Sequence, residues 1–441
     1  MAFSLRGVHV PHRKNTADKP VLCMEPPKTV TIPMSMHIGA VAKPVVKVGD
    51  LVQVGTLLAE ANGALSTPIY ASVSGKITKI TDYLLSSGQT VPAVVIASDG
   101  EMTPDSSLTP PTVHSREELI EAIKASGVVG LGGAGFPTYF KLNVDPARID
   151  HLVINGAECE PYVTSDTVTM TERADDMAYA LEALRVHLGI RSVLIGIEGN
   201  KARAIETMTQ MAQSASKEDC TVAVKVLPAI YPQGGEKVLI YQTTGRIVPV
   251  GKLPIDVGCV VINCTTLAAI GSYLKTGMPL VKKCVTVAGG AVKDPQNVIA
   301  PIGASMEDVF AACGGLTCEP KKVIYGGPMM DVAVPSITAP VLKNTNAILA
   351  LTDAEAKQPK TTACIRCGSC ANSCPFGLNP AEIARAYQKK DAKALDALAL
   401  MACMECGCCS FVCLANRPLV QTNKLGKVFL KEEQAKEGSR S

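Results

Sequence analysis

The sequence contains no tryptophan, and aromatic residues of any kind are scarce. Aromatic residues make up 4% of the 441 residues, whereas hydrophobic residues make up 47%. The hydrophobic cores must therefore be built from Val, Ile, Leu and Ala, a composition that suits small β-rich modules and α/β sheets. A chain of this length exceeds one ordinary domain, so we expect several modules.

The sequence also lacks a strong net charge and a long apolar run. The formal net charge of +3 gives no basis for binding nucleic acid or adhering to acidic lipid. The longest uncharged stretch, residues 258–274, contains Asn263, Thr265 and Ser272, whereas a membrane-spanning helix needs about 20 mostly apolar residues. The first residues, MAFSLRGVHVPHRK, lack the apolar core of a signal peptide. We therefore expect a cytosolic protein without a membrane span of its own, free to dock on a membrane complex.

Cysteine, by contrast, is abundant, with 17 residues. Disulfides rarely persist in the cytosol, so these cysteines indicate metal binding. Eight of them form two runs of identical spacing, C-x2-C-x2-C-x3-C. Three closely spaced thiolates can bind three corners of an iron–sulfur cube, and in two-cluster ferredoxins the fourth cysteine ligates the other cluster. We predict two 4Fe–4S clusters, one held by Cys364, Cys367, Cys370 and Cys413, the other by Cys403, Cys406, Cys409 and Cys374.

A pair of structural zinc sites is the alternative interpretation of these cysteines. Zinc sites use four ligands with a gap between two pairs, which two complete four-cysteine runs fit poorly. A proline, Pro375, follows the first run, whereas Leu414 follows the second. Cys408 is out of register with its run, and we expect it and the cysteines outside the runs to be buried thiols.

The N-terminal part of the chain has a β pattern. Residues 29–98 contain short alternating apolar runs separated by Gly and Pro turns, which is typical of hairpins. The pattern resembles the barrel-sandwich fold of biotinyl and lipoyl domains, with a generic β-sandwich as the alternative. Because no lysine sits at a carrier-type hairpin tip, we expect a packing module. Residues 101–114 are polar and proline-rich, which indicates a linker.

Helix and strand patterns alternate in the middle of the chain. A helix is predicted to begin at Ser115, which has capping-box spacing to Glu118. Strands separated by helices predict a parallel, doubly wound sheet. The expected strands are 152–154, 193–198 and 221–227, with a helix at 171–188 between the first two. Residues 283–330 then form a small α+β module with a helix near 305–312, and the charged tail KEEQAKEGSRS is expected to fray.

Two segments of the α/β region have the composition of a ligand site. Glycines in GLGGAGFPT (130–138) let backbone N–H groups approach a phosphate closely, although a plain turn is the alternative. INGAECEP follows the strand at 152–154 and places Glu158 and Glu160 at the carboxyl end of a parallel strand, where such sheets bind ligands. Carboxylates there can accept hydrogen bonds from ribityl or ribose hydroxyls. Solvated loop charges are the alternative.

In combination, GLGGAGFPTYFKL and INGAECEP resemble the flavin-site signature of the NADH-oxidising subunit of respiratory complex I. The segments YPQGGEKVLIYQTTGR (231–246) and VVINCTTLA (260–268) fit the same family. The resemblance implies a bound FMN lined by Gly132, Gly133, Gly135, Lys141, Asn155, Glu158, Asn263 and Thr266. It implies an NAD(H) site faced by Phe136, Glu160, Gly234 and Glu236, with Lys252 as a further candidate. No residue is implied as catalytic.

Two positions differ from that family. Leu131 stands where complex I has Arg, and Ala157 stands where it has Asp, and both differences remove polar contacts near the flavin. The region 283–330 resembles the soluble-ligand-binding β-grasp (SLBB) module that follows the flavin domain in complex I.

Three N-terminal segments are similar to the RnfC family, whose members are peripheral subunits of the Rnf electron-transport complex. The segments are FSLRGVHVPHRKN, HIGAVAKPVVKVGDLVQVG and SVSGKI. The resemblance covers nearly the whole chain and implies a multidomain α/β and α+β architecture. Its expected units are an N-terminal barrel-sandwich hybrid at 1–110, a Rossmann-like FMN/NADH domain at 115–275, an SLBB β-grasp module at 281–330 and a two-cluster ferredoxin domain at 345–425.

The RnfC resemblance implies a subunit of a ferredoxin:NAD+ oxidoreductase that lies peripherally on the cytoplasmic face of the cell membrane. It would exchange electrons between NAD(H), FMN and the clusters, while other subunits translocate Na+ or H+ and ferredoxin acts indirectly. Two alternatives stay open. A soluble cobalamin reductase of the microcompartment type shares the flavin signature and the cysteine runs, but the N-terminal sequence favours RnfC. A flavin-free electron-wiring polyferredoxin is favoured by Leu131 and Ala157 and opposed by Glu160 and Glu236.

Overall fold

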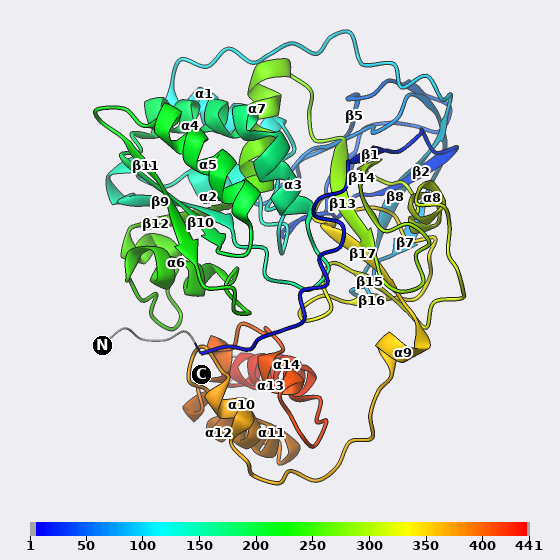
Figure 1. Cartoon of the computed structure of the whole chain (residues 1–441). Helices are drawn as coiled ribbons and strands as arrows, with labels where there is room; N and C mark the ends of the chain where they lie inside the picture. Colours follow the sequence, from blue (N-terminus) through cyan, green and yellow to red (C-terminus); the bar gives the residue numbers. More distant parts are fainter. Residues whose placement is uncertain (1–5, 439–441) are drawn as a thin grey trace.

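A computed structural model of the chain describes residues 6–438. Three parts are distinct in Figure 1: an α/β part in green, a β-rich part in blue and yellow, and a small helical lobe in orange and red. The blue N-terminal segment runs between the first two parts and passes beside the lobe. No helix within residues 6–438 combines the length and the apolar character that crossing a membrane requires.

The N-terminal β unit consists of two small sheets with strand orders β2-β8-β7-β4 and β3-β5-β6. Its core is aliphatic, with Ile32, Leu58 and Ile77 fully buried, as the scarcity of aromatic residues predicts. The strands are β2 (Thr29–Pro33), β3 (Lys43–Pro44), β4 (Leu51–Val52), β5 (Leu57–Glu60), β6 (Ile69–Tyr70), β7 (Gly75–Leu84) and β8 (Thr90–Ser98).

The α/β unit is built on a four-stranded parallel sheet of order β11-β10-β9-β12. The strand order reverses between β9 and β12, so the carboxyl ends of these two strands border the crevice where such sheets bind ligands. The strands are β9 (His151–Gly156), β10 (Ser192–Glu198), β11 (Thr221–Leu227) and β12 (Cys259–Asn263). The helices are α1 (Arg116–Ala125), α2 (Thr138–Leu142), α3 (Ser165–Glu172), α4 (Ala174–Leu188), α5 (Ala202–Ala215), α6 (Glu236–Thr244) and α7 (Cys264–Thr276).

One predicted helix of this unit is two helices in the structure. The chain leaves helical geometry at Arg173, so α3 and α4 replace the single helix expected at 171–188. The Arg173 guanidinium donates to Asp176 at 2.8 Å and to the Ala268 carbonyl at 3.3 Å, which fixes the break. The α3 segment is rich in Thr, which has a low helix propensity, so its pattern did not predict a helix. Burial of residues such as Met170 stabilises it instead.

The third unit is a six-stranded mixed sheet of order β1-β14-β13-β17-β15-β16. It extends past the expected limit at residue 330, because β17 lies between β13 and β15. Residues 347–351 therefore belong to this sheet and not to a cysteine-rich unit beginning at 345. All five residues of β17 are buried, as in a central strand. The elements are β1 (Leu22–Cys23), β13 (Lys282–Ala288), β14 (Gln296–Pro301), α8 (Met306–Ala312), β15 (Lys322–Tyr325), β16 (Ala333–Val334), β17 (Ala347–Leu351) and α9 (Asp353–Ala356).

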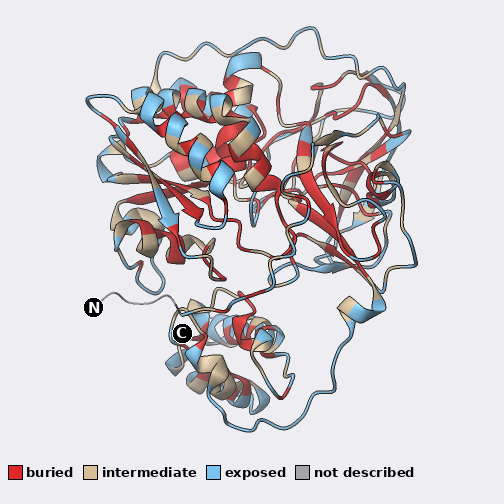
Figure 2. Ribbon diagram, in the orientation of Figure 1, coloured by how far each residue is buried: buried red, intermediate tan, exposed pale blue. Residues whose placement is uncertain are grey.

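An exposed segment, residues 357–368, leads from α9 into the helical lobe (Figure 2). The lobe contains α10 (Ser369–Asn372), α11 (Pro380–Gln388), α12 (Ala392–Ala397), α13 (Cys408–Phe411) and α14 (Leu419–Gly438). The expectation of a frayed tail is wrong as far as Gly438, because α14 continues to that residue. Leu430 of α14 is buried among the residues of α11 and α12, and this contact extends the helix into the charged tail.

Candidate functional site

Two asparagines at the ends of β9 and β12 organise the crevice of the α/β unit. Asn155 and Asn263 are register partners on these adjacent strands. The Asn263 side chain accepts from the backbone N–H groups of Thr265 and Thr266 at 2.9 and 3.2 Å and so caps α7. The Asn155 amide donates to the Gly234 carbonyl at 2.9 Å. The predicted positions Asn155, Gly234, Asn263 and Thr266 are thus brought to one edge of the sheet.

The glycine loop lies against the same edge. The Leu131 backbone N–H donates to Thr266 Oγ1 at 2.9 Å, while the Leu131 side chain turns into the core. A Cβ atom at Gly132 would lie 2.4 Å from the Asn263 amide nitrogen, so this close approach requires glycine. Residues 132–134 are exposed, and nothing lies within 4 Å of the position a Cβ would take at Gly133. The loop therefore presents open backbone beside the crevice.

Glu158 is not a solvated loop charge. Its carboxylate is buried and accepts from the Asp166 N–H at 2.7 Å and from Thr167 Oγ1 at 2.8 Å, at the start of α3. A carboxylate at a helix N-terminus is favoured by the helix dipole. Burial nevertheless raises the pKa of Glu158, with Lys14 acting in the opposite direction. The groups that Glu158 contacts in this structure are the protein's own donors.

Glu160 is also withdrawn from solvent, but it faces another unit. Its Oε2 accepts from the Met329 N–H at 3.1 Å, and its Oε1 lies 3.3 Å from the Tyr231 hydroxyl, a donor. Burial raises the pKa of Glu160 to about 8, and the nearby Asp331 carboxylate adds to the shift. A Cβ at Gly327 would lie 2.2 Å from Oε2, so the loop before β16 is packed tightly against this carboxyl group.

Glu236 forms an ion pair with Lys141 at 2.6 Å, which the sequence did not predict. Both side chains are partly exposed, at 40% and 34% respectively. Lys141 also donates to the Val261 carbonyl on β12 at 3.1 Å. Phe136 packs edge to face against Phe140, with ring centroids 5.9 Å apart. Lys141 and Glu236, implied as flavin and dinucleotide residues, therefore lie in contact.

Three lysines that sequence reasoning missed, one half-buried and two buried, surround the loop after β9 and the glycine loop. Lys14 donates to the carbonyls of Glu158 and Glu160, at 2.8 and 3.0 Å. Lys201 donates to the Glu158 carbonyl at 3.0 Å, and Lys283 of β13 donates to the Leu131 carbonyl at 2.8 Å. Burial lowers the pKa of Lys283 to about 8. These lysines come from three distant segments, so no local sequence pattern identifies them.

Several buried polar groups of the α/β unit have no hydrogen-bond partner among residues 6–438. They are Arg116 Nε, Thr138 Oγ1, Ser165 Oγ and both amide atoms of Gln233. A buried polar group without a partner is costly, typically by about 1–3 kcal/mol. Such groups, together with the open backbone of the glycine loop, fit a unit that receives a polar cofactor. Gln233 was not among the predicted residues, although it lies inside the segment 231–246.

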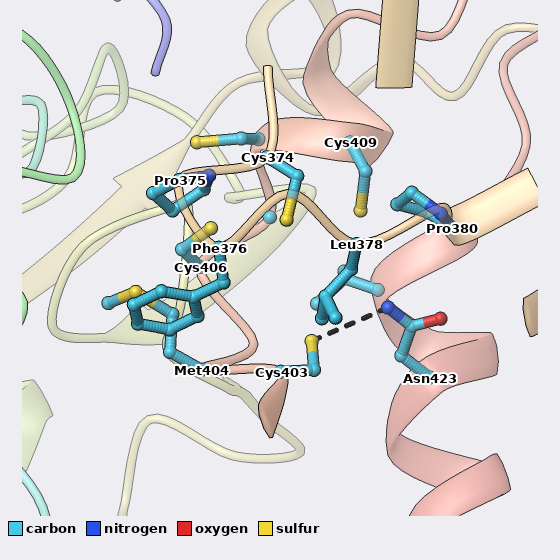
Figure 3. A pocket seen from close by; sticks show the side chains of 13 residues that line it. Cys374, Pro375, Phe376, Leu378, Pro380, Cys403, Met404, Cys406, Cys409 and Asn423 are labelled. Carbon is cyan, nitrogen blue, oxygen red and sulfur yellow. Dashed lines mark hydrogen bonds between the residues drawn. The ribbon is translucent and has the colours of Figure 1, made fainter. Parts of the chain in front are cut away.

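In the helical lobe, four predicted cysteines line one small, largely apolar cavity. Figure 3 shows Cys374, Cys403, Cys406 and Cys409 around this space, with the Asn423 amide donating to Cys403 Sγ at 3.4 Å. Cys374 comes from the first run and the other three from the second. Cysteines from both runs thus meet at one cavity, which fits the exchange of the fourth ligand in two-cluster ferredoxins.

The remaining four predicted ligands lie nearer the surface. Cys370 and Cys413 are half-buried and pack against one small cluster with Leu419. Cys364 and Cys367 lie on the exposed segment 357–368. Cys408, expected to be a buried bystander, is fully buried, with its thiol 3.9 Å from the Tyr231 carbonyl.

Comparison with known proteins covers all of these units. Residues 3–101 match the RnfC barrel sandwich hybrid domain. The chain is 43% identical over 390 residues to a subunit of the Na(+)-translocating ferredoxin:NAD(+) oxidoreductase complex of Acetobacterium woodii, covering 87% of each chain. It is 40% identical over 443 residues to a subunit of the ion-translocating oxidoreductase complex of Rhodobacter capsulatus, covering 99% of this chain and 85% of that one. The chain belongs to the RnfC family.

Another relative of the RnfC family is a subunit of the proton-translocating ferredoxin:NAD(+) oxidoreductase complex of Clostridium ljungdahlii, 40% identical over 87% of this chain and 84% of its own. Residues 123–272 match the Nuo51 FMN-binding domain, residues 284–333 the SLBB domain and residues 357–414 the 4Fe–4S dicluster domain. The expected fold class and the order of its modules are confirmed, as are an FMN-binding and an iron–sulfur domain.

Among solved structures, two of an NAD+-reducing [NiFe]-hydrogenase, air-oxidised and H2-reduced, share the fold. Their TM-scores are 0.51 and 0.50, at 19% identity over 71% of this chain and 64% and 62% of theirs. At this identity the likeness concerns the fold alone. Membership of the RnfC family favours the RnfC interpretation over the soluble cobalamin reductase that the sequence left open.

Proposed function

We propose that this chain exchanges electrons between NAD(H), FMN and two 4Fe–4S clusters, as a subunit of a ferredoxin:NAD+ oxidoreductase whose other subunits translocate Na+ or H+. The names of the relatives in Acetobacterium woodii and Clostridium ljungdahlii support this role. The observation that carries the proposal is contact between the two candidate sites. The loop that begins at Tyr231 accepts a bond from Asn155 in the crevice and donates one to Cys406 in the cysteine cavity.

On the flavin side, the glycine loop would hold FMN with the open backbone of Gly132 and Gly133, and Gly135 would shape its turn. A flavin accepts two electrons as a hydride and releases them singly, which links a nicotinamide to one-electron clusters. Asn155, Asn263 and Thr266 would line the sides of the FMN site. Lys141, Glu158 and the unpartnered groups of Thr138, Ser165 and Gln233 would supply or orient polar contacts.

Phe136, Gly234 and Glu236 would face the dinucleotide, with Lys252 nearby in sequence, whereas the Glu160 carboxyl group packs behind this wall against the loop before β16. Glu236 supports this assignment best, because its carboxylate is partly exposed. Carboxylates accept hydrogen bonds from ribose hydroxyls in dinucleotide folds. With a pKa raised to about 8, Glu160 is largely protonated at neutral pH and would act there as a neutral hydrogen-bonding group.

On the cluster side, Cys374, Cys403, Cys406 and Cys409 would hold one cluster, and Cys364, Cys367, Cys370 and Cys413 the other. The units would be 1–110, 115–275, an SLBB-containing unit lengthened to 351, and a ferredoxin-type lobe lengthened from the expected limit at 425 to include all of α14. The chain would sit peripherally on the cytoplasmic face of the membrane, bound to other Rnf subunits and serving ferredoxin indirectly.

Metal and flavin analysis of anaerobically purified protein tests this function. We expect about eight irons and eight acid-labile sulfides per chain, the content of two cubes, together with FMN. Cys406→Ser should lose one cluster, whereas the neighbouring Cys408→Ser should keep the full iron content. Zinc without labile sulfide, or protein that binds no flavin after reconstitution with FMN, would refute the proposal.

A further inference from the structure

One tyrosine connects the α/β unit to the cavity of the helical lobe. Tyr231 is 2% exposed, and its hydroxyl donates to the Cys406 backbone carbonyl at 2.6 Å. The same hydroxyl lies 3.3 Å from Glu160 Oε1. A tyrosine hydroxyl carries one proton and accepts through its oxygen. A protonated Glu160 would therefore donate to Tyr231 while Tyr231 donates to Cys406, giving an unbroken chain of hydrogen bonds.

The position of this hydroxyl is fixed from both sides. The backbone of Tyr231 pairs with Val8 through two hydrogen bonds of 2.8 and 3.0 Å. A Cβ atom at Gly235 would lie 2.2 Å from Met404 Cε, and one at Gly407 would lie 2.6 Å from a backbone carbonyl of the loop before β16. The lobe therefore packs closely against the α/β unit at Gly235 and against the third unit at Gly407. The Tyr231 side chain is itself buried at this contact, with its backbone held by Val8.

The two sets of cluster ligands differ in burial and in position. Cys406 and Cys409 are buried, and Cys406 lies in one apolar cluster with Tyr231 and Cys159 of the α/β unit. Cys364 and Cys367 are exposed on the segment that joins the lobe to the sheet of the third unit. The set of Cys406 therefore contacts the α/β unit, whereas two cysteines of the other set are exposed. Because the set of Cys406 lies where the lobe packs against the α/β unit, it is the better placed of the two to exchange single electrons with the flavin site.

We propose that Tyr231 is a positioning residue that holds the Cys406 loop against the flavin-type unit, and that the cluster of Cys374, Cys403, Cys406 and Cys409 is the one that exchanges electrons with the flavin site. This inference rests on the proposed function. In each step one electron leaves one centre and enters the other, and no bond forms or breaks. The cluster of Cys364, Cys367, Cys370 and Cys413 is then the outer one, which exchanges electrons with a partner protein.

Tyr231→Phe tests this role, because it keeps the ring and removes only the hydroxyl. Iron, sulfide and FMN contents and NADH oxidation with ferricyanide should equal those of the wild type. The polar surroundings of a cluster help to set its potential, and the Tyr231 O–H bond points its positive end toward the Cys406 backbone, which favours the more negative, reduced form. An EPR-monitored redox titration should therefore show one cluster shifted to a lower potential. In stopped-flow mixing with NADH, flavin reduction should be unchanged and cluster reduction several-fold slower.

Two further variants make the result specific. Tyr325→Phe is a matched control, because Tyr325 also donates to a backbone carbonyl, that of Pro340 at 2.5 Å, within the third unit. Tyr325→Phe should change the potential of neither cluster. In a Cys367→Ser background, which disables the outer cluster, the Tyr231→Phe shift should persist.

Three results would overturn the inference. The first is a change in the potential of the outer cluster instead of the inner one. The second is that neither the potentials nor the rate of cluster reduction changes. The third is loss of iron from Tyr231→Phe. The last would make the hydroxyl a folding requirement of the lobe. Failure of the wild-type flavin to react with NADH would instead refute the proposed function, so the two failures are distinguishable.

Discussion

Glu160 places a carboxyl group where its charge is poorly solvated, and this has a consequence for stability. The pKa of Glu160 is raised from 4.5 to about 8 in the folded protein, chiefly by burial. Between these values the folded state binds more protons than the unfolded state, so stability falls as pH rises through this window. The stabilising contribution is complete below the unfolded pKa and is lost above about pH 8.

Glu160→Gln, which mimics the protonated form, should remove that dependence. We expect the thermal midpoint of the wild type to fall more steeply than that of the variant between pH 5 and 8, as measured by anaerobic scanning calorimetry. Identical pH profiles would show that Glu160 is ionised throughout. Glu182→Gln, at an exposed ion pair with Arg185, serves as the control and should leave the slope unchanged.

Glu236→Gln tests whether the Glu236 carboxylate contacts the dinucleotide. A charged hydrogen bond to a ribose hydroxyl is worth about 1–3 kcal/mol, so we expect NADH affinity to fall roughly tenfold or more. FMN should be retained, because the flavin contacts come mainly from the glycine loop and the asparagines. The ion pair with Lys141 is partly exposed, so its loss should cost at most about 1 kcal/mol of stability. Steady-state NADH oxidation with ferricyanide, beside flavin quantification, measures both effects.

Each outcome of the Glu236 experiment has a clear meaning. Loss of flavin and NADH affinity together would make Glu236 a flavin-site or structural residue. Loss of neither would make it a solvated charge paired with Lys141. At this scale the structure brings the predicted residues Asn155, Asn263 and Thr266 to one edge of the sheet. The sequence did not predict that Glu158 caps a helix or that Glu160 faces the lobe, because the first depends on a helix that the pattern did not show and the second on partners distant in sequence.

Among the elements, the glycine loop is held from two other units. Its Gly135 carbonyl accepts from the Ile38 N–H of the N-terminal β unit at 3.0 Å. Its Gly133 carbonyl accepts from the Asn344 amide at 3.0 Å. The N-terminal unit was expected to be a packing module, and one surface that it packs against is the candidate flavin loop. The loop conformation therefore depends on elements far from it in sequence.

Asn344→Ala should loosen this loop. The loss of one hydrogen bond, worth about 1 kcal/mol, should weaken FMN binding about fivefold without changing iron content. Flavin retention after dialysis and fluorescence titration with FMN measure the effect. Asn372→Ala, at an exposed asparagine of the lobe, is the matched control. Unchanged FMN affinity in Asn344→Ala would show that the loop holds its shape alone.

Sequence periodicity predicted β9, β10, β11 and the start of α1 closely, since these have strong local patterns and a capping serine, but it did not predict β12 as a strand. It missed α3 and the extension of α14 because tertiary burial, not helix propensity, stabilises them. It also placed β17 outside the third unit. A run such as AILAL is compatible with any buried strand, and only pairing with β13 and β15 assigns it to a sheet.

For the whole molecule, cysteine spacing led to the prediction that Cys374 belongs with the second run, and the structure places Cys374 beside Cys403, Cys406 and Cys409 at one cavity. Cysteine spacing could not predict which set faces the flavin-type unit, because that depends on how the lobe packs against Tyr231. The exposed segment 357–368 connects the lobe to the third unit, while the packing contacts of the lobe include the α/β unit. The two candidate sites thus meet through folding of the whole chain.

Electron transfer from the clusters to NAD+ tests the central claim most directly. Anaerobic protein with FMN bound would be reduced with titanium(III) citrate, freed of reductant and mixed with NAD+. The account predicts that NADH appears as the EPR signals of the reduced clusters disappear, and that flavin-free protein does neither. Reduced clusters that persist beside NAD+ in the flavin-loaded protein, with no NADH formed, would contradict it.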